Sequence, residues 1–192
     1  FSLALINREI GDSAAASAYL RQAIAHGKRV DEAYYYLGRM AEDNNEPDEA
    51  IANYMQVRVG DGPEYFAANS RIGQIQVEQG QLDRSHAWFD GQREKYPQLR
   101  DQLYGLEADI LTRAGATNDA MLLLNQAPDS TSLRYARAML SEQQDDLVSM
   151  ERDLRTILAA DPDNATALNA LGYTLADRTT RYAEALELVS RA

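Results

Sequence analysis

The sequence predicts an all-α fold, a solenoid of about five to six repeated helix–turn–helix units. The first observation is a small residue that recurs at intervals of 34, 35, 35, 30 and 34 residues, at Ala4, Gly38, Gly73, Ala108, Ala138 and Gly172. The second is a position twelve residues after each of these, which is small in most units: Ala16, Ala50, Ser85, Ala120 and Met150, with Ala185 after thirteen. Periods of roughly 20–50 residues are typical of repeat architectures, in which each repeat is one supersecondary unit.

The residues after the second position indicate that it lies on a helix. A larger apolar residue stands four residues further on in every unit, at Leu20, Tyr54, Phe89, Leu124, Leu154 and Val189. Three residues beyond these stand Ala23, Val57, Gln92, Ala127, Ile157 and Ala192. Offsets of four and three place residues on one face of a helix, so we expect the second helix of each unit to pack through this face.

A turn former separates the two helices of each unit. Seven residues after the first small residue stand Gly11, Asn45, Gly80, Gly115 and Asp145, all types that tolerate the left-handed conformation at a helix end. The last unit departs from the rule, with Thr179 and Thr180 at this place. All five prolines are expected at turns: Pro47 at a helix start, Pro128 at the end of a short unit, and Pro63, Pro97 and Pro162 between units.

Three of the recurring small residues are glycines inside predicted helices. Gly38, Gly73 and Gly172 each cost about 1 kcal/mol of helix stability relative to alanine. Their regular spacing favours a packing reason. We expect the second helix of the same unit to approach each glycine closely, through its own small residue.

These residues resemble the tetratricopeptide repeat, whose period is about 34 residues. The best units read Tyr34, Leu37-Gly38, Ala50, Tyr54 and Leu168, Leu171-Gly172, Ala185, and a third reads Ile72-Gly73, Gly80, Phe89, Pro97 without the initial aromatic residue. Two units depart from the pattern, because Glu107 and Arg137 replace the expected leucine and Met150 replaces alanine. The resemblance implies a superhelix formed by one array over 1–192, with units at 1–30, 31–64, 65–99, 100–130, 131–164 and 165–192 and an irregular join near 128–132.

The first and last units begin and end within predicted helices. We therefore expect the chain to be a fragment of a longer array. Repeat arrays normally cover their inner faces with polar capping helices. Apolar residues are accordingly expected to be exposed at both ends, namely Leu3, Leu5, Leu186 and Val189.

Composition and charge exclude several kinds of partner. The 192 residues include 30 acidic and 19 basic ones, a net charge of −11. Nucleic acids and anionic membranes attract clustered cations, so we expect neither as a partner. No apolar run approaches the ~20 residues that span a bilayer, so this chain is not expected to insert into a membrane.

The sequence offers no constellation for catalysis. There is no cysteine, the two histidines His26 and His86 lie far apart, and no nucleophile, phosphate-loop or zinc-helix motif is present. Asp161–Asn164 is interpreted as a turn and helix cap rather than a calcium loop, and the acid pairs at 42–43 and 145–146 as solvated or capping groups. We expect a protein that is not an enzyme and that uses no cofactor or metal.

The family resemblance implies where a partner binds. First helices line the concave side of such a superhelix. The following residues are therefore predicted to face a groove that holds a protein or peptide: Tyr35, Arg39, Glu42, Gln74, Glu78, Asp109, Arg113, Tyr135, Met139, Asn169 and Tyr173. Acids outnumber bases in this set, which favours a basic or neutral segment. Tyr34 is expected to pack between repeats, and for Tyr35 and Tyr36 both packing and groove roles stay open.

The segment from Asp161 to Asp177 resembles the C-terminal repeats of proteobacterial envelope repeat proteins. Some of these are lipoproteins that bring substrates to a carboxyl-terminal processing protease. The resemblance implies an adaptor on the periplasmic side of the outer membrane, with a cytoplasmic location as the alternative. Two other hypotheses are a structural spacer in an envelope secretion or pilus-assembly machine, and part of an enzyme whose catalytic domain lies elsewhere. Partner identity and oligomeric state stay open.

Overall fold

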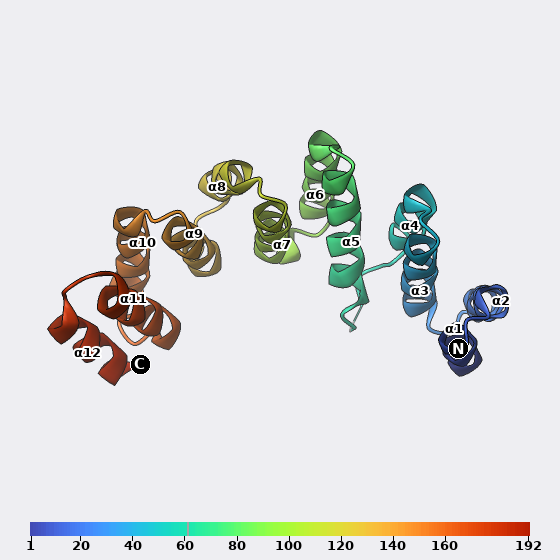
Figure 1. Ribbon diagram of the computed structural model, residues 1–192, viewed down its shortest axis with the longest axis horizontal. Coiled ribbons are helices and arrows are strands. Elements are labelled where there is room, and N and C mark those ends of the chain that lie inside the picture. The colour runs from blue at the N-terminus through green and yellow to red at the C-terminus, as the bar shows by residue number, and fades with distance from the viewer. Residues whose placement is uncertain (61) are drawn as a thin grey trace. The chain divides into compact units, whose positions relative to one another are not determined.

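The helices of the chain follow one another in pairs (Figure 1). The structure, a computed structural model, describes residues 1–60 and 62–192, and this part contains twelve α-helices, one short 3-10 helix and no strand. The first helices of the pairs are α1 (Ser2–Glu9), α3 (Val30–Asp43), α5 (Glu64–Glu78), α7 (Arg100–Arg113), α9 (Thr131–Gln143) and α11 (Ala165–Arg178). The second helices are α2 (Ser13–Ala25), α4 (Pro47–Tyr54), α6 (Leu82–Lys95), α8 (Thr117–Gln126), α10 (Leu147–Ala160) and α12 (Tyr182–Arg191). The predicted all-α fold of helix–turn–helix repeats is confirmed.

The chain divides into two compact units, an N-terminal unit (Phe1–Gly91) and a C-terminal unit (Gln92–Ala192). In the N-terminal unit, α1 packs on α2 and α3 on α4, and α2 and α4 each contact the first helix of the next pair. In the C-terminal unit, the pairs α7–α8, α9–α10 and α11–α12 pack in the same way.

The turns within pairs have the predicted conformation. Gly11, Asn45, Gly80, Gly115 and Asp145 all have positive φ angles, between 61° and 83°. In the last pair Thr179 is extended instead, with φ −140° and ψ 178°. Asn45 and Asp145 hold a conformation that strains most residues other than glycine, and a short polar side chain makes it tolerable.

The repeating positions of the second helices form the core. The first of these positions is buried in all six pairs, at Ala16, Ala50, Ser85, Ala120, Met150 and Ala185. The larger apolar residues four places later are buried in the first five pairs. In the last pair, Leu188 is buried at this offset from Gly172, and Val189 is half-buried.

Two of the three glycines singled out in the sequence, Gly38 and Gly172, lie against the second helix of their own pair, as predicted. A Cβ atom added to Gly38 would lie 2.5 Å from the ring of Tyr54, and one added to Gly172 would lie 2.6 Å from Val189. The neighbour of Gly38 is therefore the large residue of α4, not the small Ala50 that the sequence suggested. At Gly172 the backbone oxygen of Ala185 also stands at 3.1 Å, so there the small residue does take part.

Two charged residues stand where leucine was expected, and each of them forms an ion pair that is buried or partly buried. Glu107 is fully buried, and Arg93 Nη1 donates to its Oε2 at 2.6 Å. Arg137 donates to both oxygens of Asp153, at 2.6 and 2.8 Å, and the Asp153 side chain is buried. Each departure from the repeat pattern is thus balanced by an opposite charge on a neighbouring helix, as a buried charge requires.

The join between α8 and α9 differs from the others. α8 ends at Gln126, Ala127 is extended with ψ 154°, and Pro128 follows. The Ser130 side chain then accepts the Leu133 N–H and caps α9. A proline cannot continue the backbone hydrogen bonds of a helix, which explains why α8 is short.

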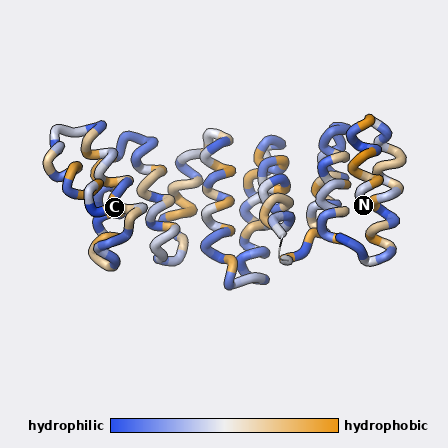
Figure 2. Tube along the Cα trace, turned by 90° about the horizontal axis from the view of Figure 1, so that it is seen from below, coloured by the Kyte–Doolittle hydropathy of each residue, from blue (hydrophilic) through white to orange (hydrophobic). Residues whose placement is uncertain are grey.

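Apolar residues were expected to be exposed at both ends of the chain, and this holds for only some of them. Leu3 and Leu186 are exposed, whereas Leu5 and Val189 are half-buried, so the expectation was wrong for these two. Leu5 faces α3, and Val189 packs against Gly172. Apolar and polar stretches alternate along every helix (Figure 2), and no helix in the described part is long and apolar enough to cross a membrane.

Candidate protein-interaction surface

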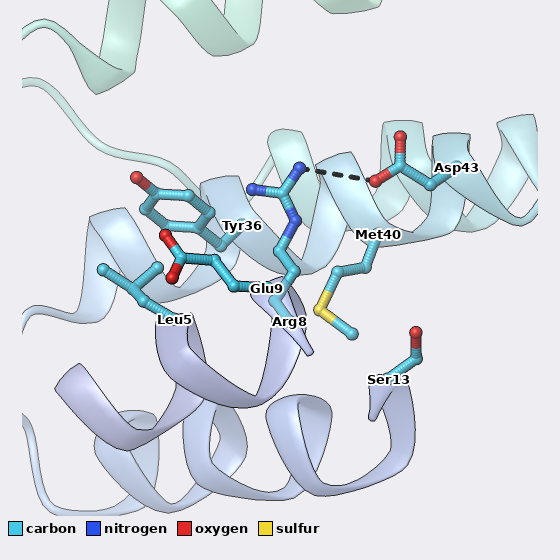
Figure 3. Close-up of a pocket in the computed structure, with 7 residues that line it drawn as sticks. All are labelled: Leu5, Arg8, Glu9, Ser13, Tyr36, Met40 and Asp43. Carbon is cyan, nitrogen blue, oxygen red and sulfur yellow. Dashed lines mark hydrogen bonds and ion pairs between the residues drawn. The ribbon is translucent and has the colours of Figure 1, made fainter. Parts of the chain in front are cut away.

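A cleft in the N-terminal unit lies between two consecutive first helices, α1 and α3. It has a volume of about 510 Å³. Figure 3 shows the residues that line it, which are Leu5, Arg8, Glu9, Ser13, Tyr36, Met40 and Asp43. We call this site the α1–α3 cleft. Its volume is within the roughly 300–1,000 Å³ that small-ligand sites occupy, so it can receive one or two side chains of a partner.

Arg8 crosses the α1–α3 cleft. Its guanidinium carbon lies 5.7 Å from the centre of the Tyr36 ring, and its Nη2 lies 3.4 Å from Asp43 Oδ2. Tyr36 in turn meets the Phe1 ring edge to face, with ring centres 5.7 Å apart. These contacts hold the tyrosine and the arginine in place across the two helices.

The edge of α3 that lies away from the α1–α3 cleft faces α4 and α5, and its polar groups form hydrogen bonds within the protein. The Glu42 carboxylate accepts hydrogen bonds from the Tyr54 hydroxyl and from Arg71. Arg71 also donates to Gln74 Oε1 at 2.5 Å, and the Gln74 amide donates to Ser70 at 3.2 Å. This network joins the second and third helix pairs.

The network alters the acid–base chemistry of two of its members. Burial tends to raise the pKa of Glu42, but the hydrogen bonds from Arg71 and Tyr54 outweigh it and hold that pKa below its ordinary value. Burial, and then the hydrogen bond to Glu42, raise the pKa of Tyr54 well above its ordinary value. Glu42 is therefore ionised at neutral pH and Tyr54 keeps its proton.

The prediction that Glu42 is a groove acid available to a partner is corrected by these contacts. Its carboxylate is bound inside the protein, and its side chain is only 13% exposed. Tyr35 is half-buried, with its ring centre 5.7 Å from that of Tyr54. Arg39 is also half-buried, and a hydrogen bond with Tyr35 raises its pKa. Glu78 is exposed at the end of α5.

The Glu42 network should make the stability of the N-terminal unit depend on pH. The pKa of Glu42 in the folded state is lowered from 4.5. The contribution of the Glu42 carboxylate to the free energy of unfolding is therefore complete above about pH 4.5, and it is lost as the pH falls through the folded-state pKa. We expect Glu42→Gln to cost about 1–2 kcal/mol at pH 7 and to cost less at pH 3.5. Urea unfolding at both pH values measures this.

The control for this experiment is Glu187→Gln, which removes an exposed acid from α12. It should change the free energy of unfolding little at either pH. An equal cost of Glu42→Gln at pH 7 and pH 3.5 would contradict the stabilising role of the ionised carboxylate.

A second cleft lies between first helices in the C-terminal unit. It separates α7 from α9 and has a volume of about 150 Å³. Its lining is Gly105, Ala108, Asp109, Thr112, Leu124, Ala136, Met139, Leu140 and Gln143. We call this site the α7–α9 cleft. It is narrow and largely apolar, and it contains two of the residues predicted from the sequence, Asp109 and Met139.

The other predicted residues of the C-terminal unit lie in varied surroundings. Arg113 forms an ion pair with Asp109, with Nη2 and Oδ2 2.5 Å apart. Tyr135 packs against the core together with Met139. Asn169 is half-buried, and Tyr173 is 65% exposed on α11. The groove as a whole stays a prediction. The structure brings its residues together in two places, at the α7–α9 cleft, and in the N-terminal unit where Arg39 contacts Tyr35 and where Arg71 joins Glu42 to Gln74.

Four residues on the first helices were missed, namely Arg8, Met40, Asp43 and Arg71, and for Tyr36 both packing and groove roles had been left open. Tyr36, Met40 and Asp43 each follow a predicted groove residue by one position, so the choice of helix face was displaced by one residue. One signal was present in the sequence. Arg8 and Asp43 are opposite charges 35 residues apart, which is one repeat period, and they face each other in the structure.

The acidic segments have the predicted capping role at two residues, whereas Glu42, Asp43 and Asp145, which were predicted as solvated or capping groups, are bound to arginines. Asn164 accepts the Ala167 N–H and caps α11, and Asp146 accepts the Ser149 N–H and caps α10. Asp145 pairs with Arg178, and Asp43 with Arg8. Among the residues described, no group of three or more metal-ligating side chains comes together.

Comparison with known proteins identifies the repeat. The tetratricopeptide repeat model matches residues 1–59 and 151–192, more than half of the chain. This chain belongs to the tetratricopeptide repeat family. The section that the match leaves out, 60–150, includes Glu107 and Arg137, which replace the pattern leucine.

One relative extends the likeness over most of this tetratricopeptide repeat chain. A TPR repeat-containing protein of Pseudomonas aeruginosa is 42% identical over 167 residues, 85% of this chain. The chain spans only 28% of the length of that relative. The chain is therefore similar to one section of that longer repeat protein.

Two solved structures are similar to this chain at low sequence identity. A double mutant of MamA has a TM-score of 0.47 at 13% identity, over 84% of this chain and 91% of that one. The nearly identical TPR-like repeats of a Podosopora anserina protein described as a kinesin light chain have a TM-score of 0.48 at 14% identity, over 83% and 92%. The fold assignment rests on the helix pairs themselves.

Proposed function

We propose that this chain is a non-catalytic scaffold that holds a segment of a partner protein against its first helices. The observation that carries the proposal is that each unit has a cleft between consecutive first helices, α1 and α3 in one and α7 and α9 in the other. Both clefts combine apolar side chains with a few polar groups, which is the usual composition of binding sites. Tetratricopeptide repeats are protein-interaction modules, and this supports the proposal.

The more specific proposal is an adaptor that brings substrates to a periplasmic protease of the carboxyl-terminal processing type. The resemblance of the segment from Asp161 to Asp177 to envelope repeat lipoproteins supports it. The likeness to a repeat protein of Pseudomonas aeruginosa is consistent with a bacterial source. On this proposal the chain works at the periplasmic side of the outer membrane.

The second candidate is a structural spacer within an envelope secretion or pilus-assembly machine. An ion-pair network on second helices of the C-terminal unit favours it. Arg155 and Arg181 each bridge Glu151 of α10 and Glu184 of α12. A network of this kind ties neighbouring repeats together, as a spacer that transmits force requires.

Site-specific photo-crosslinking in the bacterium that makes the protein distinguishes the two candidates. We expect a photoreactive phenylalanine at Tyr36 or Met139 to form adducts with a partner protein. The same group at Val148, which is 79% exposed on α10, should form few. For the adaptor proposal, the adducts contain a carboxyl-terminal processing protease or its substrates.

The outcome can contradict the scaffold proposal directly. Adducts at Val148 with none at Tyr36 or Met139 would place the contact on the second helices. No adduct at any of the three positions would favour the spacer. Adducts that contain neither such a protease nor its substrates would keep the scaffold and remove the adaptor.

A further inference from the structure

We infer that the α1–α3 cleft receives an extended partner segment in which an apolar side chain and a lysine or arginine stand two or three residues apart. This inference rests on the proposed binding at first helices and specifies the chemistry of the partner there.

One end of the α1–α3 cleft combines apolar side chains with a carboxylate, and the other end is polar. Leu5 and Tyr36 stand at the first end beside the Glu9 carboxylate, Asp43 and Ser13 stand at the second, and Met40 lies between the two ends (Figure 3). A leucine, methionine or similar side chain is suited to the end with Leu5 and Tyr36. Burial of such a side chain against apolar surface contributes at roughly 25 cal/mol per Å² of area removed from water.

The charges of the cleft leave an excess of negative charge. Arg8 is its one basic lining residue, and its guanidinium is already placed against Tyr36 and Asp43. Glu9 is exposed, and within the described chain it forms no hydrogen bond or ion pair through its side chain. A cation from the partner would therefore find Glu9 open and would share Asp43 with Arg8. An acidic segment would have to draw Arg8 away from Asp43 and would leave two uncompensated carboxylates.

The spacing of the lining residues fits an extended segment. Leu5 and Glu9 are four residues apart on α1, about 6 Å along the helix axis, and Tyr36 and Asp43 are seven apart on α3, about 10 Å. An extended chain advances about 3.3 Å per residue, so side chains two or three residues apart match these distances. The apolar residue then lies at Leu5 and Tyr36 while the basic residue reaches Glu9 or Asp43.

The α7–α9 cleft does not offer the same chemistry. Its acid, Asp109, is paired with Arg113 on the same helix. Its walls include Gly105, Ala108 and Ala136, which leave about 150 Å³. This cleft is suited to a small apolar side chain, so the preference for a basic residue belongs to the α1–α3 cleft.

The test uses three synthetic nonapeptides of a glycine–serine sequence that carry Leu-Ser-Lys, Leu-Ser-Glu or Ser-Ser-Lys at the centre. Binding to the full chain is followed by NMR through the methyl resonances of Leu5 and Met40. We expect the Leu-Ser-Lys peptide to bind about tenfold more tightly than either of the others, and added salt to reduce the difference. Glu9→Lys should abolish the preference for lysine over glutamate.

Glu187→Lys is the matched control, because it makes the same change of charge on α12, outside the cleft, and should leave the preference intact. Equal binding of the three peptides, tighter binding of the Leu-Ser-Glu peptide, or no binding of any of them would overturn the inference. None of these results removes the scaffold proposal, which fails only if the first-helix positions form no adducts in the crosslinking experiment.

Discussion

Replacing Glu107 with leucine is expected to lower the free energy of unfolding of the C-terminal unit by about 3–5 kcal/mol, although leucine is the residue that the repeat pattern calls for. Glu107 is fully buried and accepts from Arg93 Nη1 at 2.6 Å, and the Arg93 side chain is only 5% exposed. The substitution takes away this carboxylate and leaves the guanidinium in a site that excludes water. The 4.1 Å stacking of Arg93 over Tyr104 compensates little for the loss.

The double variant Arg93→Met with Glu107→Leu is the control for this result. It replaces both charges with apolar groups of similar length, and exchanges of this kind are often neutral or stabilising. Urea unfolding and hydrogen exchange of the amides of α7 measure both variants. If Glu107→Leu alone unfolds at the same urea concentration as the unaltered protein, the pair is not what stabilises this position.

Replacing Gly38 with leucine should destabilise the N-terminal unit by about 1–3 kcal/mol or more. A Cβ atom at this position already falls 2.5 Å from the Tyr54 ring, and Tyr54 is buried and held by Glu42 and Tyr35. The ring has little room to withdraw, so α3 and α4 must separate. Hydrogen exchange in α3 and α4 should rise more than in the C-terminal unit, because a repeat depends chiefly on its neighbours.

Gly91→Ala is the matched control in the same unit. Gly91 lies in α6 with open space around it, so alanine should add up to about 1 kcal/mol through helix propensity. An unchanged melting temperature for Gly38→Leu, beside a raised one for Gly91→Ala, would contradict the close packing of α3 on α4.

The repeat itself was predictable because its determinants are local. A positive φ angle at Asn45 or Asp145 needs only the right residue at the turn, and the offsets of four and three along α2 need only helical geometry. Both can be deduced from a single stretch of sequence. The recurring small residue of the first helices, which lies against a neighbouring helix, could be predicted for the same reason. That Tyr54 is the neighbour of Gly38 could not be predicted.

The interaction surface was harder to predict because it depends on how each helix is rotated against its neighbours. The period of the repeat does not fix that rotation to within one residue, and so Tyr35 was chosen where Tyr36 lines the cleft. Glu42 shows the second difficulty. Its partner Arg71 is 29 positions away on α5, and only the packing of the two helices makes the carboxylate unavailable. Asp153, the partner of Arg137, was missed for the same reason.

The packing of helices on near neighbours has a consequence for how the chain folds. In the described part, the main helix–helix packings join each helix to the next one or the next but one along the chain. Low contact order of this kind requires only short loops to close, so the entropic barrier to folding is small and folding is fast. A helix pair can form as soon as it leaves the ribosome, and within a unit each later pair docks on a surface that is already in place. Synthesis from the N-terminus would therefore build each unit one repeat at a time, with little unpaired apolar surface exposed at any moment.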